Sequence, residues 1–238
     1  MAKGLPTIKS SSGICKGYIV GKHPEHKFDR GKASHEKGIW GLIHSYISGP
    51  IPTTSMSGSW YIITFIDDFS RYTWVFFLKK KYEILERFTK FKASVENASG
   101  RKINSIIYHN GGDYIKSKFL QICADSGIQI QHSIPYTPQQ NGVEERKNRA
   151  LKEMTTCMLE AKGLVANLWA EAMNIFAHIQ RIVPHFYMKG NTPLKSYFGH
   201  NMDVSNFKVL GSIAWAQILL DKRKYLQPKS IECFYLDI

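Results

Sequence analysis

The hydrophobic pattern of the chain changes character near residue 39. Residues 1–38 are basic and polar, rich in Gly, Ser and His, and show neither helical nor strand periodicity, which indicates a tail or a damaged module. Beyond them lie short runs dense in β-branched and aromatic residues, Trp40 to Ile47, Trp60 to Ile66 and Tyr72 to Leu78, each typical of a strand. The five residues between the last two runs are turn-like and predict a hairpin.

The rest of the pattern alternates between helices and strands. Apolar residues at helical spacing predict helices over about 82–98, 115–126, 140–161 and 167–182, and short apolar runs predict strands over 103–108 and 128–134. In the longest of these helices, one face carries Val143, Ala150, Leu151, Met154 and Met158. The tail is β-like from Phe207 and again from Ile231 to Leu236. This order predicts an α/β fold in which helices pack on the faces of a mixed sheet.

The net charge of the chain indicates what kind of partner it binds. The 238 residues include 32 Lys and Arg against 19 Asp and Glu, a net charge of +13, which favours binding to nucleic acid over a merely solubilising surface. No apolar run is long enough to span a bilayer, so no membrane association is expected, and the first residues lack the apolar core of a signal peptide. Four scattered cysteines favour a reduced, intracellular protein, nuclear or cytoplasmic and not secreted.

A polar loop with Gly and Pro runs into a basic helix between Ile134 and Arg149, and it places Glu144 and Glu145 in the first turn of that helix. Candidate phosphate contacts follow along the helix and at the end of one predicted strand; they are Arg146, Lys147, Arg149, Lys152, Lys79, Lys80 and Lys81. The alternative is a solvated basic face. Gln139 and Asn141 are predicted either to contact DNA or to form the polar loop and cap of the helix.

This loop and helix closely resemble the motif that carries the last catalytic carboxylate in integrases of copia-type long-terminal-repeat retrotransposons. Further matches lie at Gly58 to Arg71, Trp169 to Ala172, Asn191 to Pro193 and Phe207 to Gly211. The resemblance covers the chain from about residue 13 onward and implies a ribonuclease-H-like fold. It divides the chain into a remnant of a zinc-binding module with its linker (1–38), a catalytic core (39–163), a helical extension (164–204) and a partial small β-barrel-like segment (205–238).

The resemblance also implies a two-metal strand-transfer site for Mg²⁺ or Mn²⁺, built from two Asp and one Glu. The Glu corresponds to Glu145, but the two Asp positions are occupied by Tyr46 and His109. From His109 to Glu145 is 145 − 109 = 36 positions, the spacing that the family uses, so the positions match while the ligands do not. A neutral phenol is a poor Mg²⁺ ligand, and imidazole suits transition metals better.

No other carboxylate is predicted to replace the missing metal ligands, and the zinc-binding module is incomplete as well. Asp67 and Asp68 are predicted to cap and fix the hairpin turn rather than to bind metal. In the zinc module, Cys15 is a lone remnant because Tyr18 occupies the position of the last cysteine, so no zinc is expected.

These observations together predict a degenerate integrase core whose DNA strand transfer is absent or severely weakened. The resemblance implies element and target DNA as partners and allows a homo-oligomer. The alternatives are a non-catalytic nucleic-acid-binding protein that keeps the fold, and an unmaintained transposon fragment.

Overall fold

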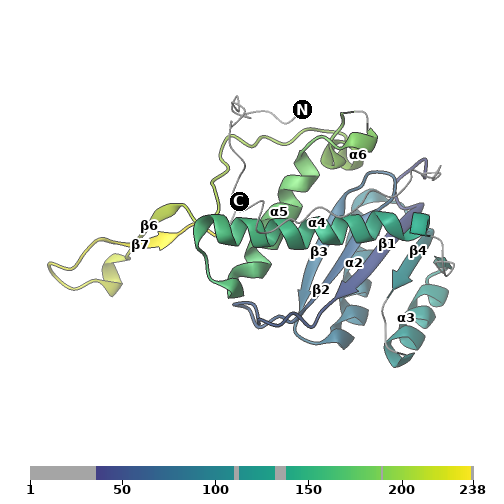
Figure 1. Ribbon diagram of the computed structural model, residues 1–238, viewed down its shortest axis with the longest axis horizontal. Helices are drawn as coiled ribbons and strands as arrows, with labels where there is room; N and C mark the ends of the chain where they lie inside the picture. Colours follow the sequence, from purple (N-terminus) through teal and green to yellow (C-terminus); the bar gives the residue numbers. More distant parts are fainter. Residues whose placement is uncertain (1–35, 110–112, 132–137, 189, 237–238) are drawn as a thin grey trace.

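The fold is built on a five-stranded mixed sheet. The computed structural model describes residues 36–109, 113–131, 138–188 and 190–236 (Figure 1). The strands are β1 (Leu42–Ser48), β2 (Tyr61–Asp67), β3 (Thr73–Leu78), β4 (Ser105–His109) and β5 (Gln129–Gln131), in the order β3-β2-β1-β4-β5. Strand β2 is antiparallel to both of its neighbours, β1 and β3, whereas β1, β4 and β5 run parallel to one another.

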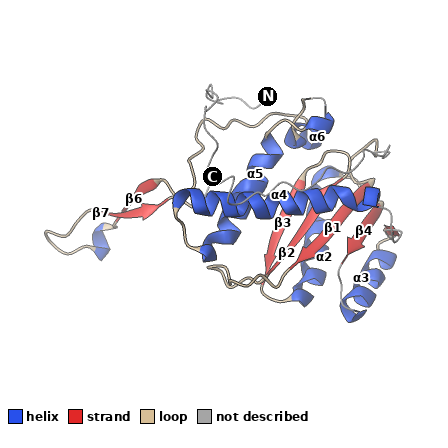
Figure 2. Cartoon of the chain, in the orientation of Figure 1, coloured by secondary structure: helices blue, strands red, loops and turns tan. Residues whose placement is uncertain are grey.

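Helices cover both faces of this sheet (Figure 2). Helices α2 (Ile84–Ser99) and α3 (Asp113–Asp125) pack on one face, and α4 (Pro138–Lys162) and α5 (Trp169–Ile182) pack on the other. A short helix, α6 (Pro193–Phe198), follows α5. Single 3₁₀ turns lie at Lys81–Glu83, Ala166–Leu168, Phe186–Met188 and Leu220–Lys222. None of the helices in the described part of the chain combines the length and apolar character that crossing a bilayer requires.

The face under α2 and α3 is mainly apolar because most of the strand residues that point to it are large hydrophobes, with Ser45 and Asp67 as buried exceptions. Ile43 and Phe65 are fully buried there, and the ring of Phe65 stacks on Phe91 of α2 with centroids 4.3 Å apart. Phe88 and Phe119 extend the cluster toward α3, their centroids 4.7 Å apart. Burial of aromatic rings of this size dominates the stability of such a core.

The opposite face has a smaller apolar core under α4 and α5. Ile62 and Val75 on the sheet belong to one buried cluster with Leu151 of α4 and Trp169 of α5. The indole Nε1 of Trp169 donates a hydrogen bond to the carbonyl oxygen of Thr53, at 2.9 Å. This bond ties the start of α5 to the loop between β1 and β2.

The predicted hairpin, the mixed sheet and the helices on its two faces are confirmed, with element ends shifted by a few residues. The C-terminal prediction needs correction at its start. The strand expected from Phe207 begins only at Ile213, because residues 210 and 211 form a turn in which Gly211 has a φ of 73°. Strands β6 (Ile213–Gln217) and β7 (Ser230–Phe234) then form a separate two-stranded antiparallel ribbon, and the described residues form no closed barrel.

The inward face of α4 also differs from the expected one. Leu151 is buried as predicted, but Val143, Ala150, Met154 and Met158 are only partly buried. Apart from Gly142, the buried residues in the described part of this helix are Glu144, Asn148, Leu151, Thr155, Cys157 and Leu159, and three of these six are polar. The helix therefore lies rotated relative to its apolar pattern and turns polar groups toward the sheet.

Candidate active site

Two of the residues singled out from the sequence lie side by side on the sheet. The parallel pairing of β1 with β4 sets Tyr46 opposite His109, and the antiparallel pairing of β1 with β2 sets Tyr46 opposite Thr64. Neighbours in register on adjacent strands share a face of the sheet. Thr64 faces α4, so this row lies under that helix. The structure describes the backbone of His109, and its side chain lies outside the described part.

Hydrogen bonds fix the start of α4 above this row. The hydroxyl of Thr64 donates to Asn148 Oδ1 at 3.2 Å and lies 3.4 Å from the carbonyl oxygen of Tyr46. The Nδ2 of Asn148 in turn donates to the carbonyl oxygen of Glu144 at 2.8 Å. Helix α4 begins at Pro138, so Glu144 and Glu145 lie in its second turn and not in the first, as was predicted. Because Glu144 is one helical turn before Asn148, both residues are held near the end of the sheet that carries Tyr46 and His109.

The two neighbouring glutamates have opposite environments. Glu145, the residue predicted from the family motif, is exposed to solvent, whereas Glu144 is only 1% exposed. Burial, and secondarily the negative charge of Glu145, raises the pKa of Glu144 to about 8. The sequence analysis named Glu144 beside Glu145 but assigned it no role and did not predict its burial. The signal that could have found it is its helical spacing of four and seven residues from Asn148 and Leu151.

The turn between β2 and β3 carries a buried charged network. Asp67 accepts hydrogen bonds from the backbone and the hydroxyl of Ser70, at 2.8 and 2.6 Å, which confirms its predicted capping role. Asp68 lies 3.0 Å from His44 Nε2 and 3.1 Å from Arg71. Burial alone would raise the pKa of Asp68, but the hydrogen bond from His44 and the charge of Arg71 hold it well below its usual range.

The predicted nucleic-acid contacts on α4 separate into two groups. Arg146, Arg149 and Lys152 are exposed and follow one another at intervals of three residues along the helix. A Cβ atom on Gly142 would lie 2.7 Å from the guanidinium of Arg146, so the glycine leaves room for that side chain to fold back. Lys147 points the other way: it is partly buried, and its Nζ donates to Gln180 Oε1 of α5 at 3.0 Å.

The other predicted contacts lie at the helix start and on the edge strand. Lys79 and Lys80 are exposed and Lys81 is partly buried, just after β3. Because β3 runs in the same direction as β1, these lysines lie at the same end of the sheet as Tyr46. Gln139 and Asn141 are in the first turn of α4, and their side chains lie outside the described part. Cys15 also falls outside the described residues.

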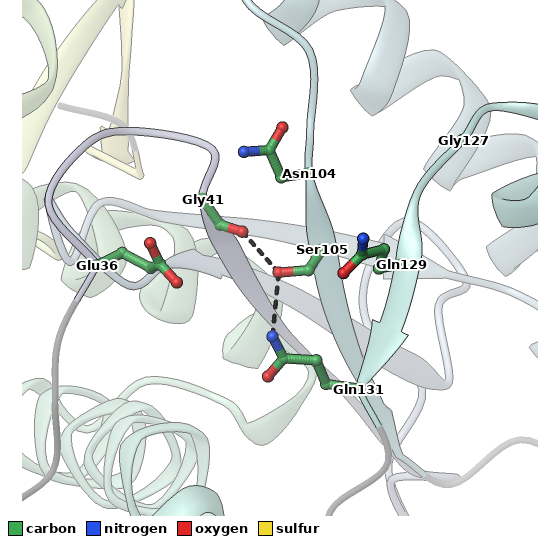
Figure 3. A pocket seen from close by; sticks show the side chains of 7 residues that line it. All are labelled: Glu36, Gly41, Asn104, Ser105, Gly127, Gln129 and Gln131. Carbon is green, nitrogen blue, oxygen red and sulfur yellow. Dashed lines mark hydrogen bonds between the residues drawn. The ribbon is translucent and has the colours of Figure 1, made fainter.

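A polar pocket of about 340 Å³ lies where β1 and β4 begin, at the end of the sheet away from Tyr46 and His109 (Figure 3). Its central residue is Ser105, which donates to the carbonyl oxygen of Gly41 at 2.6 Å and accepts from the amide of Gln131 at 3.4 Å. The lining residues are Glu36, Gly41, Asn104, Ser105, Gly127, Gln129 and Gln131, none of them a residue predicted to be functional.

The ligand chemistry of the row does not fit a pair of hard divalent cations. A phenol and an imidazole occupy neighbouring positions in the sheet, and the exposed Glu145 supplies one carboxylate. Within the described side chains, no three or more His, Cys, Asp or Glu residues are grouped so that they could hold a metal ion.

The chain is similar to a known domain family and to known retrotransposon polyproteins. Residues 47–138 match the family model described as Integrase core domain. The chain is 34% identical over 236 residues to the retrovirus-related Pol polyprotein from transposon TNT 1-94 of Nicotiana tabacum, which covers 99% of this chain and 17% of that protein. It is 26% identical over 234 residues to the Pol polyprotein from transposon RE2 of Arabidopsis thaliana, covering 98% and 16%. The chain thus spans about a sixth of the length of these curated relatives.

Solved structures agree on the fold. A chain of the simian T-cell lymphotropic virus intasome in complex with PP2A regulatory subunit B56 gamma superposes with a TM-score of 0.57 at 15% identity, covering 87% of this chain and 72% of that one. The HTLV-2 integrase catalytic core domain in complex with magnesium, in its trimeric form, gives 0.50 at 16% identity, covering 68% and 98%. These likenesses confirm the predicted ribonuclease-H-like α/β fold.

Proposed function

Because the chain carries an integrase core domain within a segment similar to plant retrotransposon Pol polyproteins, we propose that it is a copia-type integrase core with defective strand transfer. Its ancestral role is DNA integration. The observation that carries the proposal is the register of β1 and β4, which sets Tyr46 beside His109 where the resemblance expects two aspartates.

The physical reason is the loss of hard oxygen ligands. Two-metal catalysis of phosphoryl transfer needs carboxylates that bridge and fix both ions about 4 Å apart. Glu145 on its own cannot hold two such ions, and the buried Glu144 is mostly protonated at neutral pH because its pKa is raised to about 8. Strand transfer at pH 7 is therefore expected to be lost or very slow.

The test is a strand-transfer and nicking assay in Mg²⁺ or Mn²⁺, run on the native chain beside the double variant Tyr46→Asp plus His109→Asp. We expect product from the double variant and little or none from the native chain. Equal activity of the two proteins would contradict the proposal, because other groups would then have to hold the metal ions.

A matched pair of glutamates supplies the control. In the double-variant background, Glu145→Gln is expected to abolish product, whereas Glu144→Gln is expected to leave most of it, since Glu145 is the exposed member of the pair. The opposite result would move the catalytic carboxylate to Glu144.

Binding of DNA without catalysis is the second candidate function, and the exposed basic stripe of α4 favours it. Arg146, Arg149 and Lys152 present three positive charges to solvent beside Glu145. Contacts of this kind to phosphate give affinity that does not depend on sequence and falls with salt.

The salt dependence of duplex binding tests this candidate. The double variant Arg149→Ala plus Lys152→Ala is expected to bind duplex DNA more weakly and to reduce the salt slope of log affinity by roughly two. The control, Lys90→Ala plus Lys102→Ala, removes two exposed lysines outside α4 and should leave the slope unchanged. Equal effects of the two pairs would show that net charge alone drives binding.

A further inference from the structure

A cluster of partly or fully buried positive charges lies between the β2–β3 turn, α4 and the end of α5. Lys147 projects from α4 to Gln180, and the next residue of α5, Arg181, donates from Nε to the carbonyl oxygen of Thr73 at 2.7 Å. The guanidinium of Arg181 also lies 5.0 Å from the ring centroid of Tyr72. Arg71, only 5% exposed, completes the group from the turn.

Two of these cations have neutral partners. Lys147 bonds to an amide, and Arg181 bonds to a carbonyl group and lies over a phenol ring. In the described part of the chain, neither of them forms an ion pair with a carboxylate. Asp68, a buried acid at the β2–β3 turn, lies against His44 and Arg71. Buried cations are ordinarily matched by an anion, so this arrangement carries an electrostatic cost.

The protonation equilibria reflect that cost. Burial first, and then the charges of Arg71 and Arg181, lowers the pKa of Lys147 to about 8. Burial and the charges of Lys147 and Arg71 likewise lower the pKa of His185, just after α5, to about 4. Glu144, one turn before Lys147, holds its proton at pH 7 because its own pKa is about 8, so it does not neutralise the lysine.

From this geometry we propose that Lys147, Arg181 and Arg71 form a binding site for an oxyanion of the phosphate class. Lysine supplies a point charge and the two guanidinium groups supply planar donors, the set that proteins use for phosphate oxygens. A bound phosphate group would neutralise the cluster and connect α4, α5 and the β2–β3 turn. The anion is either free phosphate or a phosphate of the DNA backbone; the second source rests on the proposed function.

Thermal unfolding in phosphate tests the site directly. At a phosphate concentration near 100 times the dissociation constant, Tm of the native chain is expected to rise by about 5–10 °C relative to sodium chloride of equal ionic strength. The variant Lys147→Met keeps the length of the side chain and removes its charge. It is expected to be more stable than the native chain in chloride and to lose most of the rise in phosphate.

The control variant is Lys102→Met, at an exposed lysine before β4, which should retain the whole phosphate effect. The site is overturned if chloride raises Tm as much as phosphate, or if Lys147→Met responds like the native chain. A second readout needs no variant: NMR of labelled lysine Nζ should show the pKa of Lys147 rising from about 8 toward 10.5 as phosphate is added. An unchanged pKa in saturating phosphate also overturns the site.

A duplex oligonucleotide then separates the two sources. If Lys147→Met weakens duplex binding at low salt and phosphate competes with the duplex, the backbone of DNA supplies the anion. If the phosphate response depends on Lys147 while duplex binding does not, the ligand is a free oxyanion. A chain that binds no duplex but keeps the phosphate response would retain this site and lose the proposed DNA-binding role, so the two failures are distinguishable.

Discussion

The two faces of the central sheet differ in what they bury. The face under α2 and α3 holds aliphatic and aromatic side chains, with Phe65 and Phe88 fully excluded from solvent. The face under α4 and α5 buries His44, Thr64 and Glu144 beside its smaller apolar core. Apolar burial stabilises a fold directly, whereas buried polar groups cost free energy unless each finds a partner. The larger apolar core and the candidate site therefore lie on opposite faces of the sheet.

This division lets the packing of the fold persist whatever residues occupy the proposed site. Tyr46 and His109, which the resemblance aligns with two carboxylate positions, lie in register on the polar face, and the apolar core does not involve them. Substitutions on the polar face can remove a reaction while the packing under α2 remains.

The largest effect is expected from the apolar face. Phe65→Ala removes a fully buried ring stacked on Phe91 and should lower the free energy of unfolding by about 3–5 kcal/mol in a urea titration. Tyr82→Ala, at a ring that is 57% exposed, is the control and should cost about 0.5 kcal/mol or less. If both substitutions cost the same, the core under α2 does not carry the stability of the fold.

The second prediction concerns the polar face and has the opposite sign. A carboxyl with a raised pKa keeps its proton in the native state, so native stability falls as pH rises from the unfolded value of 4.5 to about 8. Glu144→Gln removes this loss. At pH 8 the variant should exceed the native chain in unfolding free energy by about 2–4 kcal/mol, with little difference at pH 4.

Urea titrations across that pH range measure the effect, with Glu145→Gln as the exposed control. Above pH 8, deprotonation of Lys147 in the native state should make stability rise with pH in both proteins, because the lysine of the unfolded chain keeps its proton up to about 10.5. A Glu144→Gln difference that does not vary with pH would argue against a buried, protonated Glu144.

The smallest effect is expected where one hydrogen bond joins helix and sheet. Thr64→Val keeps the shape of the side chain but leaves Asn148 Oδ1 without its donor, which should cost about 1–2 kcal/mol in unfolding free energy. Thr89→Val is the control, since the hydroxyl of Thr89 bonds within the exposed surface of α2. Equal costs would mean that the contact of α4 with the sheet does not depend on this bond.

Most of the fold could be predicted from the sequence because it follows hydrophobic periodicity. The density of β-branched and aromatic residues in Trp60 to Ile66 and in Tyr72 to Leu78 predicted both strands of the hairpin, and the spacing of Phe88, Phe91 and Val95 predicted α2. The start of β6 was misplaced because an apolar run, Phe207 to Leu210, precedes a turn and reads as strand.

The polar side chains of the site were less predictable. Family spacing located Tyr46 and His109, and the sheet register sets them side by side. Family spacing did not reveal that Glu144 is buried while Glu145 is exposed. Hydrophobic periodicity did not reveal it either, because a carboxylate is placed on the outer face of a helix by default. For the same reason Lys147 was grouped with exposed basic residues, although it contacts Gln180. Which way a charged side chain turns depends on tertiary partners.

The ribbon of β6 and β7 has a consequence for the cooperativity of unfolding. Leu210 and Leu236 at its base belong to the core under α4 and α5, whereas Trp215, Tyr225 and Leu226 farther along are largely exposed. A two-stranded ribbon without a covered face is marginally stable in water. Its amides should therefore exchange with solvent through local opening while those of β1 and β2 wait for global unfolding. The described part of the chain would then contain two units that unfold separately. One comprises the five-stranded sheet, and the other is the ribbon, which opens from its tip toward Gly211.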